Sequence, residues 1–310
     1  MVVLSPGCWA RRTEKLALSA LLLCPIARVH AQKTEPAEHP ASYIGFDRND
    51  YPGDSALPAL HNSFSFTGYW LNNPPGETAD SWAGKRDTLR QFGFGFLLLF
   101  NGRSDAQLKA VRASGQTPTS LGAADGVAAA AAARHEGFPP GVVIFLDQEE
   151  GGRLLPEQAD YVFAWVDAVR AAGERPGVYC SGVEVREGKA MISTAQDIAE
   201  REHVRAEIGP SPKKPKPDPP LLLWIANDQC PPSPGCTLAP PALATASFGA
   251  LHTAPKVWQY AQSPRRAHFS ASCPTNQAAD GNCYAPGMPS SPSTFVDLDQ
   301  ADSADPSEGR

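Results

Sequence analysis

Short apolar runs recur along residues 43–301, and stretches with helical spacing separate several of them. These runs are continuously hydrophobic and rich in β-branched and aromatic residues, which is typical of parallel strands covered on both faces. The pattern predicts eight strands, at Tyr43–Asp47, Phe64–Leu71, Gly95–Gly102, Gly141–Glu149, Arg175–Gly182, Leu221–Asp228, Pro255–Ala261 and Thr294–Ala301. Strands that alternate with helices indicate a parallel sheet, and eight of them predict a closed, somewhat irregular (β/α)8 barrel of the TIM type in one α/β domain.

Four segments are candidate helices. The clearest is Pro156–Ala172, which has proline at the first turn, an apolar stripe at helical spacing and Gly173 directly after its end. The alanine-rich segment Ala123–His135 is the second, while Trp82–Phe92 and Met191–Arg205 have weaker patterns. These segments fall between predicted strands, as a barrel of this type requires.

The two ends of the chain have different patterns from the barrel. Arg11, Arg12 and Lys15 precede a short apolar run, and small residues surround a plausible cleavage point near Ala31. This layout predicts a signal peptide over residues 1–31, followed by a linker over 32–42, and it favours secretion or a periplasmic location. Lipid anchoring at Cys24 is the less favoured alternative, because the residues before Cys24 are two leucines. Residues 302–310 are predicted to be a disordered tail.

The charge balance limits the classes of partner. The whole chain has 27 Lys and Arg residues against 33 Asp and Glu, a formal charge of −6. Loss of residues 1–31 would remove four basic residues and one acidic residue, leaving 23 against 32 and a charge of −9. Such a balance argues against nucleic-acid binding, which depends on Lys and Arg. No segment after the signal is long and apolar enough to span a membrane, and we expect a monomer.

Five cysteines follow the predicted signal peptide. Disulfides are expected in an exported chain, and two short pairs suggest themselves, Cys230–Cys236 and Cys273–Cys283. These pairs would staple the loops after the sixth and seventh strands, including the long connection over residues 262–293. Cys180 is left over, and its apolar surroundings predict a buried, inert thiol.

The sharpest chemical signal is Asp147-Gln148-Glu149-Glu150, which closes an apolar strand. Strand residues alternate faces, so Asp147 and Glu149 are predicted to project the same way. Two close carboxyl groups raise the pKa of one of them, and a pair of this kind is commonly used to cleave glycosidic bonds. The alternative is that both acids are merely solvated at the strand end or paired with Arg153 or Arg103.

Other strand ends favour the chemical interpretation. Asp47 ends the first strand, Asp297 lies in the eighth, and closure of a barrel would make these strands neighbours. Aromatic side chains near strand ends suit a sugar, whose C–H faces stack on rings, although each aromatic alone is more often part of the core. The candidates are Tyr69, Trp70, Tyr179, Trp224, Trp258 and Tyr260.

An ordered set of short motifs resembles family-25 glycoside hydrolases, which include lysozymes, and more closely the bacterial glycoside hydrolase-like domain of unknown function DUF1906. The motifs are Gly45-Phe46-Asp47, Asp147-x-Glu149, Pro176-Gly177-Val178-Tyr179, Leu223-Trp224-Ile225-Ala226, Val257-Trp258-Gln259-Tyr260 and Val296-Asp297-Leu298. Each motif is short, and only their order along nearly the whole mature chain is specific.

The resemblance implies a set of roles at the barrel mouth. Glu149 would be the proton donor, Asp147 would steady the substrate's acetamido group or a developing positive charge, and Asp47 would shape the electrostatics. Substrate contacts are expected from Asp297, Tyr179, Trp224, Trp258, Gln259 and Tyr69. The substrate would be peptidoglycan or a related polysaccharide. No cofactor is expected, and no metal, since the histidines lack metal-ligand spacing.

One departure from the lysozymes keeps a second function open. Their strand-one continuation Asp-Val-Ser is absent, and this chain has Asp47-Arg48-Asn49 instead. A positive charge at Arg48 would hold a neighbouring carboxyl group ionised and disable it as an acid. The sequence therefore predicts a secreted glycosidase, with a non-catalytic carbohydrate-binding pseudoenzyme of the same fold as the alternative. A scaffold that uses its proline-rich loops for protein contacts has little support.

Overall fold

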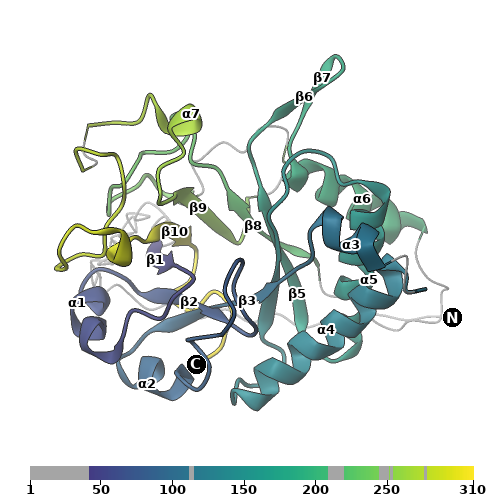
Figure 1. Cartoon of the computed structure of the whole chain (residues 1–310), viewed down its shortest axis with the longest axis horizontal. Helices are drawn as coiled ribbons and strands as arrows, with labels where there is room; N and C mark the ends of the chain where they lie inside the picture. Colours follow the sequence, from purple (N-terminus) through teal and green to yellow (C-terminus); the bar gives the residue numbers. More distant parts are fainter. Residues whose placement is uncertain (1–41, 112–114, 209–219, 244–250, 252–253, 276–277) are drawn as a thin grey trace, which may run out of the picture. The chain divides into compact units, whose positions relative to one another are not determined.

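A computed structural model describes residues 42–111, 115–208, 220–243, 251, 254–275 and 278–310. The predicted signal peptide and all but the last residue of the predicted linker lie outside the described residues. Eight strands form a closed barrel in the order β1-β10-β9-β8-β5-β4-β3-β2 (Figure 1). Their bounds are β1 Tyr43–Asp47, β2 Phe66–Trp70, β3 Gly95–Asn101, β4 Val143–Gln148, β5 Arg175–Ser181, β8 Leu222–Ala226, β9 Val257–Ala261 and β10 Asp297–Ala301. Each falls inside a predicted strand, and the predicted barrel is confirmed.

The last strand runs against the rest of the sheet. β10 is antiparallel to both β1 and β9, whereas the other neighbouring pairs in the barrel are parallel. The expectation of a wholly parallel sheet is therefore wrong at this strand. Because its direction is reversed, β10 begins at the mouth, where the parallel strands end, and Asp297 pairs directly with Asp47.

Helices cover the outside of the barrel unevenly (Figure 1). Their bounds are α1 Leu57–His61, α2 Arg86–Gln91, α3 Asp105–Val111, α4 Pro118–His135, α5 Pro156–Ala171, α6 Thr194–Ile208 and α7 Ala267–Ser270. Helix α4 begins five residues before the predicted Ala123, because Thr117 caps it and Pro118 occupies its first turn. Helix α6 begins after the predicted Met191, because that residue belongs to a hairpin formed by β6 Val185–Glu187 and β7 Ala190–Ile192. No helix among the described residues is long and apolar enough to cross a membrane.

The chain end is ordered, which corrects the prediction of a disordered tail. Residues 302–310 pack at the amino ends of β3 and β4, where pairing between these strands has not yet begun. The backbone N–H groups of Phe96 and Leu98 donate to the side chains of Asp305 and Ser307 at 2.8 and 2.9 Å. Ser307 is completely buried and also exchanges backbone hydrogen bonds with both strands. The tail therefore satisfies strand groups that would otherwise lack partners.

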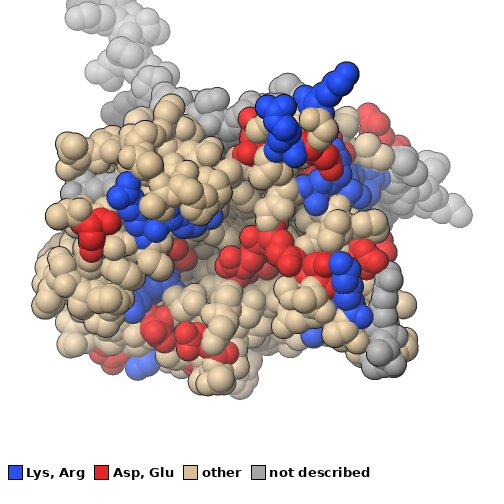
Figure 2. Space-filling model, turned by 45° about the horizontal axis from the view of Figure 1, so that its top comes forward, with Lys and Arg blue, Asp and Glu red and all other residues tan. Residues whose placement is uncertain are grey.

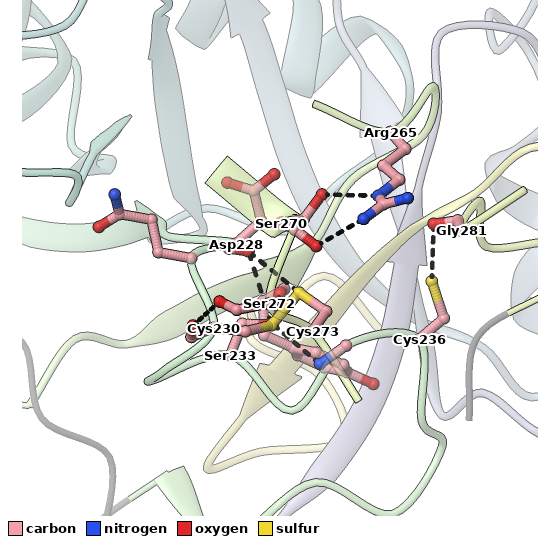
Figure 3. The surroundings of a disulfide bond; sticks show 12 residues. Asp228, Cys230, Ser233, Cys236, Arg265, Ser270, Ser272, Cys273 and Gly281 are labelled. Atoms are coloured by element: carbon pink, nitrogen blue, oxygen red, sulfur yellow. Dashed lines mark hydrogen bonds between the residues drawn. A yellow bond between two sulfur atoms is a disulfide. The ribbon is translucent and has the colours of Figure 1, made fainter. Parts of the chain in front are cut away.

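Two disulfides join the loops at the opposite end. Cys230 bonds to Cys273 and Cys236 to Cys283, so the predicted short pairs Cys230–Cys236 and Cys273–Cys283 are wrong. Each bond links the segment after β8 to the segment between β9 and β10. Figure 3 shows the surroundings of the Cys230–Cys273 bond. These segments follow neighbouring strands and lie side by side, so proximity in the fold rather than in the sequence decides the pairing. Cys180 is a free, buried cysteine, as predicted.

Candidate active site

The acidic pair of β4 lies at the carboxyl end of the barrel. Asp147 is 4 % exposed, and neither of its carboxyl oxygens has a hydrogen-bond partner among the described residues. Burial, together with the nearby charges of Glu149 and Asp47, raises the pKa of Asp147 well above its ordinary value. The buried site therefore favours the protonated, neutral form of Asp147. This environment differs from the solvated or ion-paired alternative considered above for Asp147.

Glu149 follows the last residue of β4 and lies in a more open position. The residue is exposed, yet its carboxyl group is partly surrounded by protein. This partial desolvation raises the pKa of Glu149, and the charge of Arg266 lowers it. Its own charge in turn raises the pKa of Asp47 and of Asp147, so the three carboxyl groups form one electrostatic unit. A solvent-accessible acid beside buried ones is placed where a substrate can reach it.

Asp47 and Asp297 face each other across the β1–β10 pair, and both accept hydrogen bonds from the side chain of Gln259. The side-chain amide of Gln259 on β9 donates to Asp47 Oδ2 at 2.8 Å and to Asp297 Oδ2 at 3.4 Å. The backbone N–H of Ser263 also donates to Asp297, at 2.6 Å. Gly68 on β2 makes room for this arrangement, because a Cβ atom there would lie 2.7 Å from Asp47 Cβ. Gln259 is thus a clamp for two acids rather than a free sugar ligand.

Asp299 is a member of this cluster that our sequence analysis missed. It is completely buried and accepts a hydrogen bond from Trp224 Nε1 at 3.0 Å. Desolvation raises the pKa of Asp47 to about 6, although hydrogen bonds from Asp299 and Gln259 lower it. Burial and the charge of Asp47 raise the pKa of Asp299 well above its ordinary value. Asp299 lies two residues after Asp297, and the alternation argument used for Asp147 and Glu149 identifies it equally well.

The arginine that acts on Glu149 is not the expected Arg48. Arg48 donates to the backbone oxygen of Ser293 at 3.0 Å, and the acids that act on its pKa are Asp50 and Asp297, not Glu149. The residue that acts on Glu149 is Arg266, in the loop after β9. Arg266 forms a two-pronged ion pair with the buried carboxylate of Asp228, just after β8. Neither Asp228 nor Arg266 was a sequence candidate.

The aromatic candidates divide into two groups. Tyr179 lies at the mouth, and its hydroxyl donates to Gln259 Oε1 at 2.8 Å. Trp224 lies beside it on the neighbouring strand β8, with ring centroids 4.7 Å apart, and is completely buried. Trp258 and Tyr69 are also completely buried, and they lie outside the strand cylinder: Trp258 packs on Tyr260, while Tyr69 bonds to Glu136 at the end of α4. The expectation of direct sugar contacts from Trp224, Trp258 and Tyr69 is therefore not supported by their positions.

Charge is distributed unevenly around the molecule. Figure 2 shows acidic side chains gathered at the centre of one face, with basic side chains to either side. No group of three or more His, Cys, Asp or Glu residues within the described ranges has the arrangement of a metal site. A separate groove of about 860 Å³ lies outside the barrel between α4, α5 and α6, and none of the mouth residues lines it. We place the chemistry at the mouth, because buried acids from β1, β4 and β10 converge there.

Comparison with solved structures supports the barrel. A crystal structure of an uncharacterized protein from B. stearothermophilus is 19 % identical, with a TM-score of 0.52, and the match covers 84 % of this chain and 95 % of that chain. The Mycobacterium tuberculosis Tat-secreted protein Rv2525c, in complex with L-tartrate, is 11 % identical over 85 % of this chain and 96 % of that chain, with a TM-score of 0.45. A family 25 glycosyl hydrolase from Bacillus anthracis is 11 % identical over 84 % and 88 %, with a TM-score of 0.39. At these identities, only the first match carries weight, and it concerns the fold alone.

A family model gives a more specific result. Residues 73–229 match the model described as Rv2525c-like, glycoside hydrolase-like domain, whereas no curated protein matches the chain. The matched region runs from before β3 to just after β8 and includes Asp147, Glu149 and Tyr179. This is half of the chain, and it contains the acidic pair of the mouth. The chain therefore belongs to the Rv2525c-like family of glycoside hydrolase-like domains.

Proposed function

We propose that this protein is an exported glycoside hydrolase that cleaves cell-wall or related polysaccharide, with Glu149 as the general acid. One observation carries the proposal: carboxyl groups from β1, β4 and β10 converge at the mouth of one barrel, and the accessible member, Glu149, has a raised pKa. An acid of this kind protonates the leaving-group oxygen while the glycosidic C–O bond breaks and water completes the hydrolysis. Export is supported by two disulfides, which are typical of oxidising compartments.

The surroundings of Asp147 suggest its part in this reaction. Neither carboxyl oxygen of Asp147 has a hydrogen-bond partner among the described residues, and its raised pKa favours the protonated form, which can donate a hydrogen bond. It suits the carbonyl oxygen of an acetamido group better than a developing positive charge, which an ionised carboxylate would stabilise. Asp47, ionised above a pH of about 6 and held by Gln259, is the better candidate for the latter role.

The test is Glu149→Gln, which keeps the shape of the side chain but removes the proton. Loss of a general acid lowers turnover by about 10²- to 10⁴-fold. Release of reducing ends from a panel of cell-wall polysaccharides would measure it. The matched control is Glu150→Gln. Glu150 accepts hydrogen bonds from the backbone N–H of Asp105 in α3 and from the side chain of Gln158 in α5, so its carboxyl group is turned toward these helices. We expect that control to keep activity within a few-fold.

Two outcomes would contradict the proposal. Full activity in Glu149→Gln would remove the assigned acid. Binding of a glycan by calorimetry without release of reducing ends by the native chain would favour the carbohydrate-binding pseudoenzyme. The original reason for that alternative is weaker in the structure, since Arg48 bonds to Ser293 rather than to an acid of β4.

A further inference from the structure

The β6–β7 hairpin is anchored beside the acidic pair of β4. It follows the carboxyl end of β5 and projects away from the body of the barrel (Figure 1). Gly152, three residues after Glu149, packs so closely on the hairpin that a Cβ atom there would lie 3.2 Å from Val185 Cγ2. The hairpin therefore packs against the segment that directly follows Glu149 and Glu150.

One face of the hairpin provides the anchorage. Glu187 accepts from Arg153 Nε at 2.7 Å, and Arg153 also bonds at 2.7 Å to the buried Asp197 of α6. Ile192 is buried, and Thr194, just beyond the hairpin, donates to the backbone oxygen of Gly152 at 2.8 Å. A two-stranded ribbon is marginally stable alone in water, so these contacts hold it in position.

The opposite face of the hairpin is exposed. Arg186 and Met191 are directly paired across the two strands and share this face. Met191 is 47 % exposed. Arg186 and Lys189 are exposed, and neither side chain has an ion pair or hydrogen bond within the described part of the chain. Arg186 therefore lies directly across from an exposed thioether and Lys189 lies in the adjoining turn, on a protein whose formal charge is −6.

We propose that the Arg186–Met191 face of this hairpin binds a carboxylate-bearing stretch of the glycan chain, outside the mouth and beyond the bond to be cleaved. This inference rests on the proposed function, because it requires a polymer in the mouth. A chain longer than the mouth has to continue past the surrounding loops. The guanidinium of Arg186 matches a carboxylate in shape and charge, and the thioether of Met191 offers an apolar surface to a sugar ring.

The experiment uses the full chain carrying Glu149→Gln, so that the probe is not consumed. The probe is soluble peptidoglycan strands, compared with the same strands after conversion of their carboxyl groups to amides. We expect Arg186→Gln combined with Lys189→Gln to weaken binding of the carboxylated strands five- to tenfold by calorimetry, and to leave binding of the amidated strands unchanged. The matched control is Glu184→Gln, an exposed acid just before the hairpin, which is expected not to weaken binding.

Three outcomes would overturn the inference: no binding of the carboxylated strands before the hairpin is changed, no loss of affinity in the double variant, or an equal loss for both kinds of strand. Hydrolysis is measured separately, with native Glu149. Hairpin-dependent binding without release of reducing ends would refute the hydrolase and leave the binding face standing. Cleavage by the native chain that is unchanged in the Arg186→Gln, Lys189→Gln variant would support the hydrolase and count against the binding face.

Discussion

Asp47 illustrates the loss of folding stability that follows when acids are buried together inside a barrel. Its carboxyl group is nearly inaccessible to water, and its neighbours include Asp299, Asp297 and Asp147. Burial raises the pKa of Asp147 and of Asp299, which favours their neutral forms, and the side-chain amide of Gln259 donates a hydrogen bond to Asp47. Asp47 is then the member that ionises as the pH rises through about 6. Buried acids are a poor way to stabilise a fold, because apolar side chains of similar volume stabilise a core at least as well, so the cluster fits a chemical role better than a structural one.

The raised pKa of Asp47 makes a prediction about stability. Its pKa rises from an ordinary 3.8 in the unfolded chain to about 6 in the folded protein. Below pH 3.8 both states are protonated and the group has no effect. Between 3.8 and 6 only the unfolded state loses its proton, so stability falls, by about 1–3 kcal/mol in total. We expect Asp47→Asn to raise the free energy of unfolding by this amount at pH 7 and to have no such effect near pH 3.5.

Denaturant unfolding at both pH values would measure the difference. The matched control is Glu77→Gln, an exposed acid, which should change stability little at either pH. An Asp47→Asn protein that is less stable than the native one at pH 7 would show that the carboxylate is stabilising, against our interpretation.

At the scale of elements, the loops after β8 and β9 form one cross-linked unit at the rim. The two disulfides join cysteines 43 and 47 residues apart in sequence. Arg266, whose charge acts on Glu149, and its ion-pair partner Asp228 belong to the same two segments. The two disulfides thus hold together the two segments that carry this ion pair, and the charge of Arg266 acts on the proposed acid, Glu149.

Removal of one disulfide tests this element. We expect Cys230→Ala with Cys273→Ala to lower the free energy of unfolding by about 2–4 kcal/mol, because the unfolded chain regains the freedom of a long closed loop. Thermal unfolding with and without reductant would measure the loss, and the double variant should lose less than the native chain on reduction. Peptide mapping without reduction should find Cys230 joined to Cys273. A Cys230–Cys236 peptide would contradict the assigned connectivity.

At the scale of the whole molecule, the strands and the mouth were predictable because they follow from local patterns. Continuous apolar runs located all eight barrel strands, and alternation brought Asp147 and Glu149 together. The direction of β10 was not predictable, since antiparallel and parallel strands with both faces buried have the same pattern. The disulfide connectivity and the Arg266–Asp228 pair depend on loop paths that no local period encodes. The misplacement of Trp258 was avoidable, because alternation places it opposite to Gln259.

We expect the residues at the carboxyl end of the parallel strands to serve the chemistry and those at the amino end to serve stability. Residues 302–310, which pack at the amino end, test this expectation. Asp305 and Ser307 bond to β3 at its amino end, far along the strands from Glu149. Removal of residues 302–310 exposes or leaves unpaired several strand N–H groups, so we expect a loss on the order of 3–5 kcal/mol in the free energy of unfolding. Ser307→Ala should cost about 1–3 kcal/mol by the same reasoning. Glu308→Gln removes only the exposed ion pair with Arg175 and should cost less than about 1 kcal/mol.

Glycan affinity of the Ser307→Ala protein, measured well below its unfolding temperature, should equal that of the native chain. A selective loss of affinity in a protein that remains folded would mean that the amino end communicates with the mouth, and the expectation would not hold.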